Sequence, residues 1–366
     1  MPARAPDPLA PLHGAGDNRA VVYVEGRYRC ADGKTAHGLV RYSRRYDIAA
    51  VVDSTLPEGD AGELLDGVHR GIPLFNSLEE AVGATCPGIF IVGAVSEGST
   101  LPAGYDRAVS WALSHGLHVV SGLHQFLSDN LAFRQLAEEN HCTITDVRKL
   151  FRDHKRFYTG DIRDVGSVRV ATVGTDSAVG KRTLAVALVR ELERRGHTAD
   201  MIYTGQTGWM QGWPHGVIID AMINDFVAGG IEGAIIDSWR NRQPEFMIIE
   251  GQGSLVHPFF PGGFEILAAG QVHGFLLIHA PGRSHLDGFP GYPMPDPRRV
   301  VTIATLLSQR SLLGISFNRE NLDSAGMKRA KRRYARMFDV PVVDPLADGV
   351  GALAEAVVEA RAEDQP

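Results

Sequence analysis

A short apolar run that passes through a glycine turn into a helical pattern constrains this chain more than any other feature. The run Val168–Val173 precedes the turn, and helical periodicity continues from Thr183 to Arg195. A strand, a glycine turn and a helix in this order favour a phosphate-binding loop, because backbone N–H groups and the positive end of the helix surround phosphate oxygens. The residues predicted to bind a nucleotide or another polyphosphate cofactor are Gly174, Thr175, Asp176, Ser177, Ala178, Val179, Gly180, Lys181, Arg182 and Thr183.

The spacing of this loop differs from the common consensus, which places four residues between its glycines and a serine or threonine directly after the lysine. Here five residues separate Gly174 from Gly180. Arg182 takes the place of the metal-binding hydroxyl, and Thr183 follows one position late. Lys181 is predicted to contact phosphate in either case, whereas a metal-binding role for Thr183 depends on which cofactor binds.

Composition limits the class of protein. The 366 residues, 44% of them hydrophobic, suffice for two domains with buried cores. The net charge of −6 argues against a nucleic-acid binder driven by bulk charge, and no run of 18 apolar residues is present to span a membrane. Cys30, Cys86 and Cys142 form no CxxC pair, which suits a reducing compartment. We therefore expect a cytoplasmic protein without nucleic-acid or membrane partners, and a homo-oligomer is compatible with the sequence.

Apolar runs alternate with helical patterns along the chain, which is typical of parallel α/β architecture. We expect a Rossmann-like domain at 19–142, a linker at 143–166 and a P-loop NTPase-like domain with a doubly wound parallel sheet at 167–366. Residues 1–18, rich in Pro, Ala and Gly, are expected to be disordered. The predicted strands are Ala20–Val24, Ile48–Asp53, Gly88–Ala94, His118–Val120, Val168–Val173, Asp200–Tyr203, Phe246–Glu250, Gly274–His279, Gly314–Phe317 and Val340–Val343.

Polar residues follow five predicted strands of the second domain, where parallel sheets bind their ligands. Glu250 ends one strand and can reach a metal ion or act as a base. Arg283 suits capture of a carboxylate or phosphate, and His257 is a further candidate base. The candidate substrate-binding residues are Thr204, Gln206, Thr207, Gln252, Ser254 and Arg283, and Asn318 is a candidate cofactor-binding residue. In the first domain, Gly33, Lys34 and Thr35 form a candidate second anion site.

The second domain resembles dethiobiotin synthetase and its relatives in its Gly-Thr-Asp loop, the Glu250-Gly-x-Gly turn and the late Asn318. This resemblance implies an ATP-dependent reaction in which Lys181 and Mg²⁺ stabilise a phosphoryl group that moves to a substrate carboxylate. Glu250 and Thr183 would then hold Mg²⁺, and Asn318 would contact the base.

A second resemblance spans nearly the whole chain and rests on five motifs taken together. These are Gly-Lys-Thr-Ala-His-Gly (33–38), Ser-Gly-Leu-His (121–124), the loop from Gly174 to Thr183, Thr-Gly-Gln-Thr-Gly (204–208) and Glu-Gly-Gln-Gly-Ser-Leu-Val-His-Pro (250–258). Together they resemble the D-glutamate N-acetyltransferase-like family, formerly a domain of unknown function. The resemblance implies a Rossmann-like domain followed by a P-loop-type domain, and acetyl transfer from acetyl-CoA to the amine of a small acidic substrate.

Three kinds of function therefore remain open. In an acetyltransferase the loop holds the phosphates of acetyl-CoA, Arg283 or Arg182 fixes the acidic acceptor, and His257 or Glu250 takes the amine proton, with Lys181 also in the catalytic set. In a ligase or kinase-like enzyme the loop holds ATP and Mg²⁺. In a regulator the loop binds a nucleotide or CoA without turnover.

Overall fold

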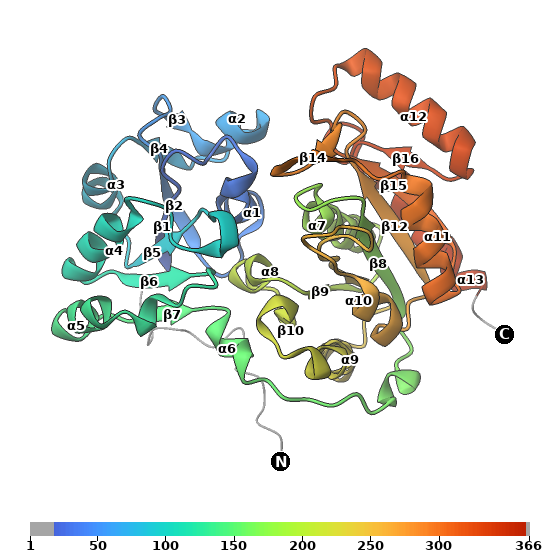
Figure 1. Ribbon diagram of the computed structural model, residues 1–366, viewed down its shortest axis with the longest axis horizontal. Coiled ribbons are helices and arrows are strands. Elements are labelled where there is room, and N and C mark those ends of the chain that lie inside the picture. The colour runs from blue at the N-terminus through green and yellow to red at the C-terminus, as the bar shows by residue number, and fades with distance from the viewer. Residues whose placement is uncertain (1–17, 364–366) are drawn as a thin grey trace.

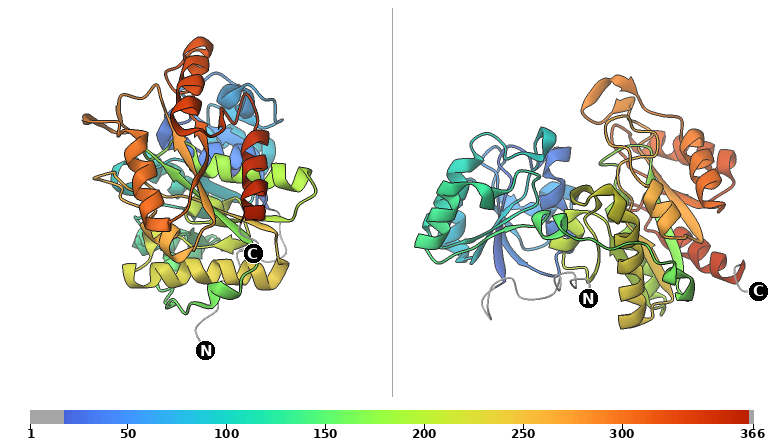
Figure 2. Two further views of the ribbon diagram at one scale, coloured as in Figure 1. Left: turned by 90° about the vertical axis from the view of Figure 1, so that its right-hand side faces the viewer. Right: turned by 60° about the horizontal axis from the view of Figure 1, so that its bottom comes forward.

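Two seven-stranded sheets form the framework of the protein. The computed structural model describes residues 18–363. Figure 1 shows the two sheets as separate lobes, the first coloured blue to green and the second green to red, and the right-hand view of Figure 2 shows the same division. Apart from Asn18, the segment expected to be disordered lies outside the described residues.

The first lobe is a Rossmann-like domain. Its sheet has the order β3-β4-β2-β1-β5-β6-β7, and only β3 runs antiparallel to its neighbour. The strands are β1 (Arg19–Tyr23), β2 (Asp47–Val52), β3 (Gly59–Asp60), β4 (Pro73–Phe75), β5 (Ile89–Val92), β6 (His118–Ser121) and β7 (Ile144–Asp146). The helices are α1 (Lys34–Tyr42), α2 (Ala61–Asp66), α3 (Leu78–Thr85), α4 (Tyr105–Ser114), α5 (Leu131–Glu139) and α6 (Lys149–Arg152).

The second lobe carries the phosphate loop. Its parallel sheet has the order β10-β9-β11-β8-β12-β15-β16. The strands are β8 (Val168–Gly174), β9 (Ala199–Tyr203), β10 (His215–Gly216), β11 (Phe246–Ile249), β12 (Gly274–His279), β15 (Leu312–Phe317) and β16 (Val342–Val343), with a hairpin of β13 (His285–Leu286) and β14 (Phe289–Pro293). The helices are α7 (Lys181–Arg194), α8 (Gln206–Met210), α9 (Asn224–Arg242), α10 (Phe264–Ala269), α11 (Pro297–Ser308), α12 (Ser324–Phe338) and α13 (Gly351–Glu363).

The strand order fixes where a ligand can bind. The chain leaves β8 towards β9 on one side of the sheet, whereas β12, β15 and β16 extend the other side. The carboxyl end of β8 therefore lies where the strand order reverses, which is the ligand-binding position of doubly wound sheets. All seven residues of β8 are buried, as expected for a central strand covered on both faces.

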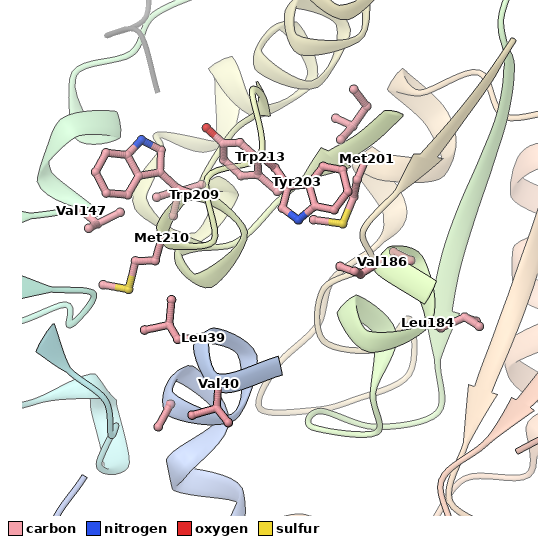
Figure 3. Close-up of a cluster of buried hydrophobic side chains, with 14 of the residues drawn as sticks. Leu39, Val40, Val147, Leu184, Val186, Met201, Tyr203, Trp209, Met210 and Trp213 are labelled. Carbon is pink, nitrogen blue, oxygen red and sulfur yellow. The ribbon is translucent and has the colours of Figure 1, made fainter. Parts of the chain in front are cut away.

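The two lobes share a continuous apolar core. Figure 3 shows Leu39 and Val40 of α1 close to Trp209 and Met210 of α8. Polar contacts also cross this junction. The Gln211 amide donates to the carbonyl of Gly38 at 2.8 Å, and the guanidinium of Arg45 lies 4.1 Å from the centre of the Trp209 ring. Because burial of large apolar side chains stabilises such a contact, the lobes form one packed unit rather than independently tethered domains.

The fold class expected from the sequence is confirmed: a Rossmann-like domain precedes a P-loop domain. Each predicted strand is present, with ends shifted by at most a few residues. The short strands β3, β4, β7 and β10 and the β13–β14 hairpin were not predicted, because two to five residues carry too little periodicity. The first sheet also continues beyond residue 142, since β7 pairs with β6 inside the expected linker. None of the helices in residues 18–363 is long and apolar enough to cross a membrane.

Candidate functional site

A cleft of about 870 Å³ separates the phosphate loop from the first domain. This volume lies within the range of small-molecule and cofactor sites. One wall consists of Ser177 to Thr183 together with Glu250 to Gly253, and the other comes from the start of α1 and the loop before it. Residues of both domains therefore face any ligand that binds in the cleft.

The phosphate loop has the geometry of an anion cradle. Ala178 and Gly180 both have positive φ angles, of 50° and 107°, which turn the chain sharply into α7. No side chain caps α7, so its first backbone N–H groups remain available at the mouth of the loop. A Cβ at Gly174 would lie 2.9 Å from Nζ of Lys181 and 3.1 Å from the carbonyl oxygen of Asp176, so a larger residue here would displace the lysine.

Lys181 is buried beneath the loop and donates to the carbonyl of Asp176 at 2.7 Å. Burial lowers the pKa of this lysine from 10.5 to about 8, against the opposing effect of Asp176. A buried ammonium that has a single carbonyl partner gains more from an incoming phosphate than a solvated lysine would. The geometry of the loop and of Lys181 therefore fits a phosphate group.

Asp176 organises the loop. Its Oδ1 accepts the backbone N–H of Ser177 at 2.6 Å, and its Oδ2 accepts Arg283 at 2.7 Å and the N–H of Asp287 at 2.9 Å. Arg283 uses its remaining donors on the carbonyl of Ser177 and on the carboxylate of Glu320. Arg283 lines the cleft, so its binding of substrate stays a prediction, but its guanidinium already connects the loop to two carboxylates.

His257 also supports Asp176 and does not face the cleft. Its Nδ1 accepts the backbone N–H groups of Phe259 and Phe260, which assigns the ring proton to Nε2. Nε2 lies 3.1 Å from Oδ1 of the Asp176 carboxylate. Burial lowers the pKa of His257. Because the one free lone pair of the neutral ring is occupied, His257 presents no base, contrary to the sequence-based hypothesis.

Glu250 remains in the cleft as a buried carboxylate at the end of β11. Its Oε2 accepts the backbone N–H of Thr204 at 3.1 Å, and its Oε1 lies 3.8 Å from the Arg182 guanidinium. Burial raises the pKa of Glu250, and Arg182 opposes this effect. Arg182 also donates to the carbonyl of Lys34 in the first domain, so this one side chain connects Glu250 to the opposite wall of the cleft.

The other candidate substrate residues divide into two groups. Gln206, Thr207 and Gln252 line the cleft, and the Gln206 amide donates to the hydroxyl of Thr35 at 2.9 Å across the domain junction. Thr204 and Ser254 are buried behind it. The Thr204 hydroxyl donates to the carbonyl of Glu250, and the Ser254 N–H donates to the carbonyl of Phe260. Thr204 and Ser254 therefore shape the loops and do not reach a ligand in the cleft.

Asn318 and Thr175 flank the phosphate loop on the β12–β15 side. The Asn318 amide donates to the carbonyl of Val179 at 3.4 Å and lines the cleft. Thr175 lies behind the loop, where its hydroxyl hydrogen-bonds His279 at 2.9 Å, and the other ring nitrogen of His279 hydrogen-bonds Tyr334 at 3.1 Å. Burial lowers the pKa of His279 from 6.5 to about 4.

The buried His279 predicts a pH dependence of stability. Its pKa is lower in the folded protein than in the unfolded chain, so the unfolded chain takes up the proton first as the pH falls. Stability is then lost between about pH 6.5 and pH 4, by roughly 3 kcal/mol in the limit. In urea unfolding, His279→Gln is expected to lose less stability over this interval than the wild type. His141→Gln, which replaces an exposed histidine far along the chain from this cluster, should keep the wild-type slope, and an identical slope for His279→Gln would contradict this prediction.

The wall formed by the first domain is the part of the site that sequence reasoning largely missed. Tyr28, Arg29, Lys34, His37, Arg41 and Arg148 all line the cleft. The sequence predicts an anion site at 33–35, but the N–H groups of Lys34 and Ala36 already donate to the carbonyls of Ala31 and Gly93. The segment therefore contributes the Lys34 ammonium rather than a backbone cradle. In the sequence, only the Gly-Lys-Thr motif at 33–35 indicated that the first domain contributes to the site.

Comparison with known proteins identifies the family of this two-domain chain. Residues 156–354 match the P-loop domain of unknown function DUF1611_C, and residues 54–150 match the Rossmann-like domain DUF1611_N. The chain belongs to the DUF1611 family. The crystal structure of a DUF1611 family protein from Anabaena variabilis superposes with a TM-score of 0.85 at 28% identity, covering 93% of this chain and 99% of that chain.

Two curated relatives of this DUF1611 chain are named D-glutamate N-acetyltransferase. The protein from Tritonibacter scottomollicae is 32% identical over 287 residues, which cover 77% of this chain and 84% of the relative. The protein from a Pseudoalteromonas species is 29% identical over 270 residues, which cover 72% of this chain and 79% of the relative. Each alignment is longer than either domain, so it includes residues of both.

Proposed function

We propose that this DUF1611 protein is an N-acyltransferase that moves an acetyl group from acetyl-CoA to the amine of a small acidic amino acid such as D-glutamate. The observation that carries the proposal is the position of Arg182 in the cleft. Its guanidinium lies beside Glu250, where a metal-dependent P-loop enzyme would hold Mg²⁺. A loop arranged in this way can bind phosphates without activating them. The names of the two relatives supply the reaction.

The residues of the chain fit the phosphates of coenzyme A. Lys181 and the uncapped start of α7 would bind the pyrophosphate, with Asn318 at the side of the loop. Asp176, Arg283 and His257 would hold the loop in shape. Bound acetyl-CoA supplies an acyl group activated as a thioester.

Glu250 is the group in the cleft best suited to take up a proton. Attack by the amine nitrogen forms the amide C–N bond and breaks the C–S bond, so the acceptor ammonium must lose protons and the departing thiolate must gain one. Because burial raises the pKa of Glu250, its carboxylate is a stronger base than an exposed one. Arg182, 3.8 Å away, would hold the carboxylate in place.

A ligase or kinase-like enzyme that uses ATP and Mg²⁺ is the second candidate. Thr183 and Glu250 both line the cleft and offer a hydroxyl and a carboxylate, the ligands that Mg²⁺ uses in P-loop enzymes. In that case Arg182 would have to move away from Glu250 when the metal binds.

An activity assay separates the two candidates. With acetyl-CoA and D-glutamate, we expect release of the CoA thiol in step with an N-acetylated product detected by mass spectrometry. L-glutamate, D-aspartate and D-glutamine serve as alternative acceptors. No thiol release with any of these acceptors, together with magnesium-dependent phosphate release from ATP that requires a carboxylic acid, would replace the acyltransferase proposal by the ligase.

A further inference from the structure

The seam between the two domains holds charged groups that the phosphate loop does not use. Lys34 comes from the first domain and Arg148 from the segment that leaves it, and Asp220 belongs to the second domain. All three line the cleft. Arg148 and Asp220 are hydrogen-bonded to each other, and Lys34 lines the same cleft.

Arg148 is the most informative of these groups. Its side chain is nearly buried, with 9% exposed, and its Nε and Nη2 donate to the two oxygens of Asp220 at 3.2 and 2.7 Å. Its Nη1 is buried and has no hydrogen-bond partner among the described residues. Leaving a buried charged donor unpaired is costly, so a ligand that accepts this hydrogen bond would be favoured.

Lys34 is the second cation of the seam. Its ammonium is exposed to the cleft and makes no ion pair or hydrogen bond within residues 18–363. The surrounding protein lowers the pKa of Lys34, and the neighbouring Arg182 and Arg148 lower it further. An anion that binds between Lys34 and Arg148 would relieve the repulsion between the two cations.

The signs of these charges select the class of ligand. Around Lys34 the cleft holds the cations Arg148 and Arg182 and the carboxylates Asp220 and Asp287. Arg182 lies beside Glu250, so Lys34 and Arg148 are the cations left for a ligand at the seam, where Asp220 remains partly exposed after pairing with Arg148. An acidic amino acid carries two carboxylates and one ammonium, the complementary set. A phosphate group complements the two cations equally well but is repelled by Asp220.

We infer that the seam is the acceptor subsite, where Lys34 and Arg148 bind the carboxylates of an acidic amino acid and Asp220 faces its ammonium. This inference rests on the proposed function. It moves acceptor recognition from Arg283 to the domain junction. Opposite walls of one cleft then hold the two substrates, the cofactor phosphates on α7 and the acceptor on the first domain.

Calorimetric titration with matched ligands tests the subsite directly, with and without CoA present. Lys34→Gln should weaken both D-glutamate and glutarate, which lacks the ammonium, by roughly tenfold to a hundredfold. Asp220→Asn should weaken D-glutamate but should not weaken glutarate. Lys155→Gln, which removes an exposed lysine outside the cleft, should bind both as the wild type does. Arg148 is left intact because its loss would remove both hydrogen bonds across the domain junction, whereas Asp220→Asn keeps an oxygen that can accept one of them.

The same variants separate this inference from the proposed function. In the acetylation assay, Lys34→Gln should raise KM for D-glutamate, leave KM for acetyl-CoA unchanged and reduce the preference for D-glutamate over D-glutamine. Wild-type D-glutamate binding that Lys34→Gln weakens, without any acetyl transfer, would retain the subsite and reject the reaction. The subsite is overturned if the wild type does not bind D-glutamate, or if Lys34→Gln weakens acetyl-CoA and not D-glutamate.

Discussion

Replacing Lys181 by methionine is expected to weaken acetyl-CoA binding by roughly 100-fold, which corresponds to about 3 kcal/mol. Methionine keeps most of the aliphatic volume of the buried side chain and removes only the ammonium. In the structure this ammonium has one carbonyl partner, Asp176, and lies under the phosphate loop. Its loss therefore removes a charge-assisted contact to phosphate, while the protein gives up little besides one hydrogen bond to a carbonyl.

Calorimetric titration of acetyl-CoA into both proteins measures this effect, and Lys155→Met controls for the loss of one positive charge elsewhere. Because the pKa of Lys181 is about 8 in the free protein, wild-type binding should also weaken above that pH. The neutral amine of Lys181 must then take up a proton before it can pair with phosphate. The Lys181→Met variant should lack this part of the pH dependence. Unchanged affinity in Lys181→Met would remove the phosphate-loop assignment itself.

Gly251→Ala is expected to destabilise the protein by about 3 kcal/mol and to abolish cofactor binding. A Cβ at this position would lie 1.8 Å from the carbonyl oxygen of Thr172 and 2.9 Å from Cδ of Lys181. The first contact is with backbone in the central strand β8, so neither partner can move cheaply, and overpacking of this kind reaches the upper end of its usual cost. Any shift that relieves it also moves Glu250 or Lys181.

Urea unfolding and acetyl-CoA titration of the same sample measure the two consequences. Gly83→Ala is the matched control, because Gly83 lies within α3 and a Cβ there meets nothing within 4 Å. Alanine has the higher helix propensity, so this control should be neutral or slightly stabilising. A Gly251→Ala protein with wild-type stability and affinity would show that neither property depends on the close packing of Gly251 against Thr172 and Lys181.

The sequence predicted the phosphate loop and the strand framework because their signals are local. Glycine spacing, Lys181 and two periodicities all fall within one short stretch, and each long strand is a contiguous apolar run. The start of α3 has an equally local cause, because the hydroxyl of Ser77 accepts the N–H of Glu80, three residues later, at 3.1 Å. Family resemblance added the order of the two domains.

The roles of single side chains could not be predicted in the same way, because they depend on partners far along the chain. Arg283 looked like a free anion-binding residue until its partner Asp176, 107 residues earlier, was placed beside it. Arg148 lay in a charged segment interpreted as a linker, and its pairing with Asp220, 72 residues later, gives it a place in the cleft. Residue type identified groups capable of the chemistry, and tertiary contacts determined which of them remain available to a ligand.

Isothermal titration of the wild-type protein with acetyl-CoA, and separately with Mg·ATP, distinguishes an acyltransferase from an ATP-dependent ligase. We expect micromolar binding of acetyl-CoA that does not depend on magnesium, because Lys181 and α7 would bind the phosphates and Arg182 occupies the position beside Glu250. Tight, magnesium-dependent binding of ATP without binding of acetyl-CoA would contradict this expectation, and would assign the cleft to carboxylate activation instead.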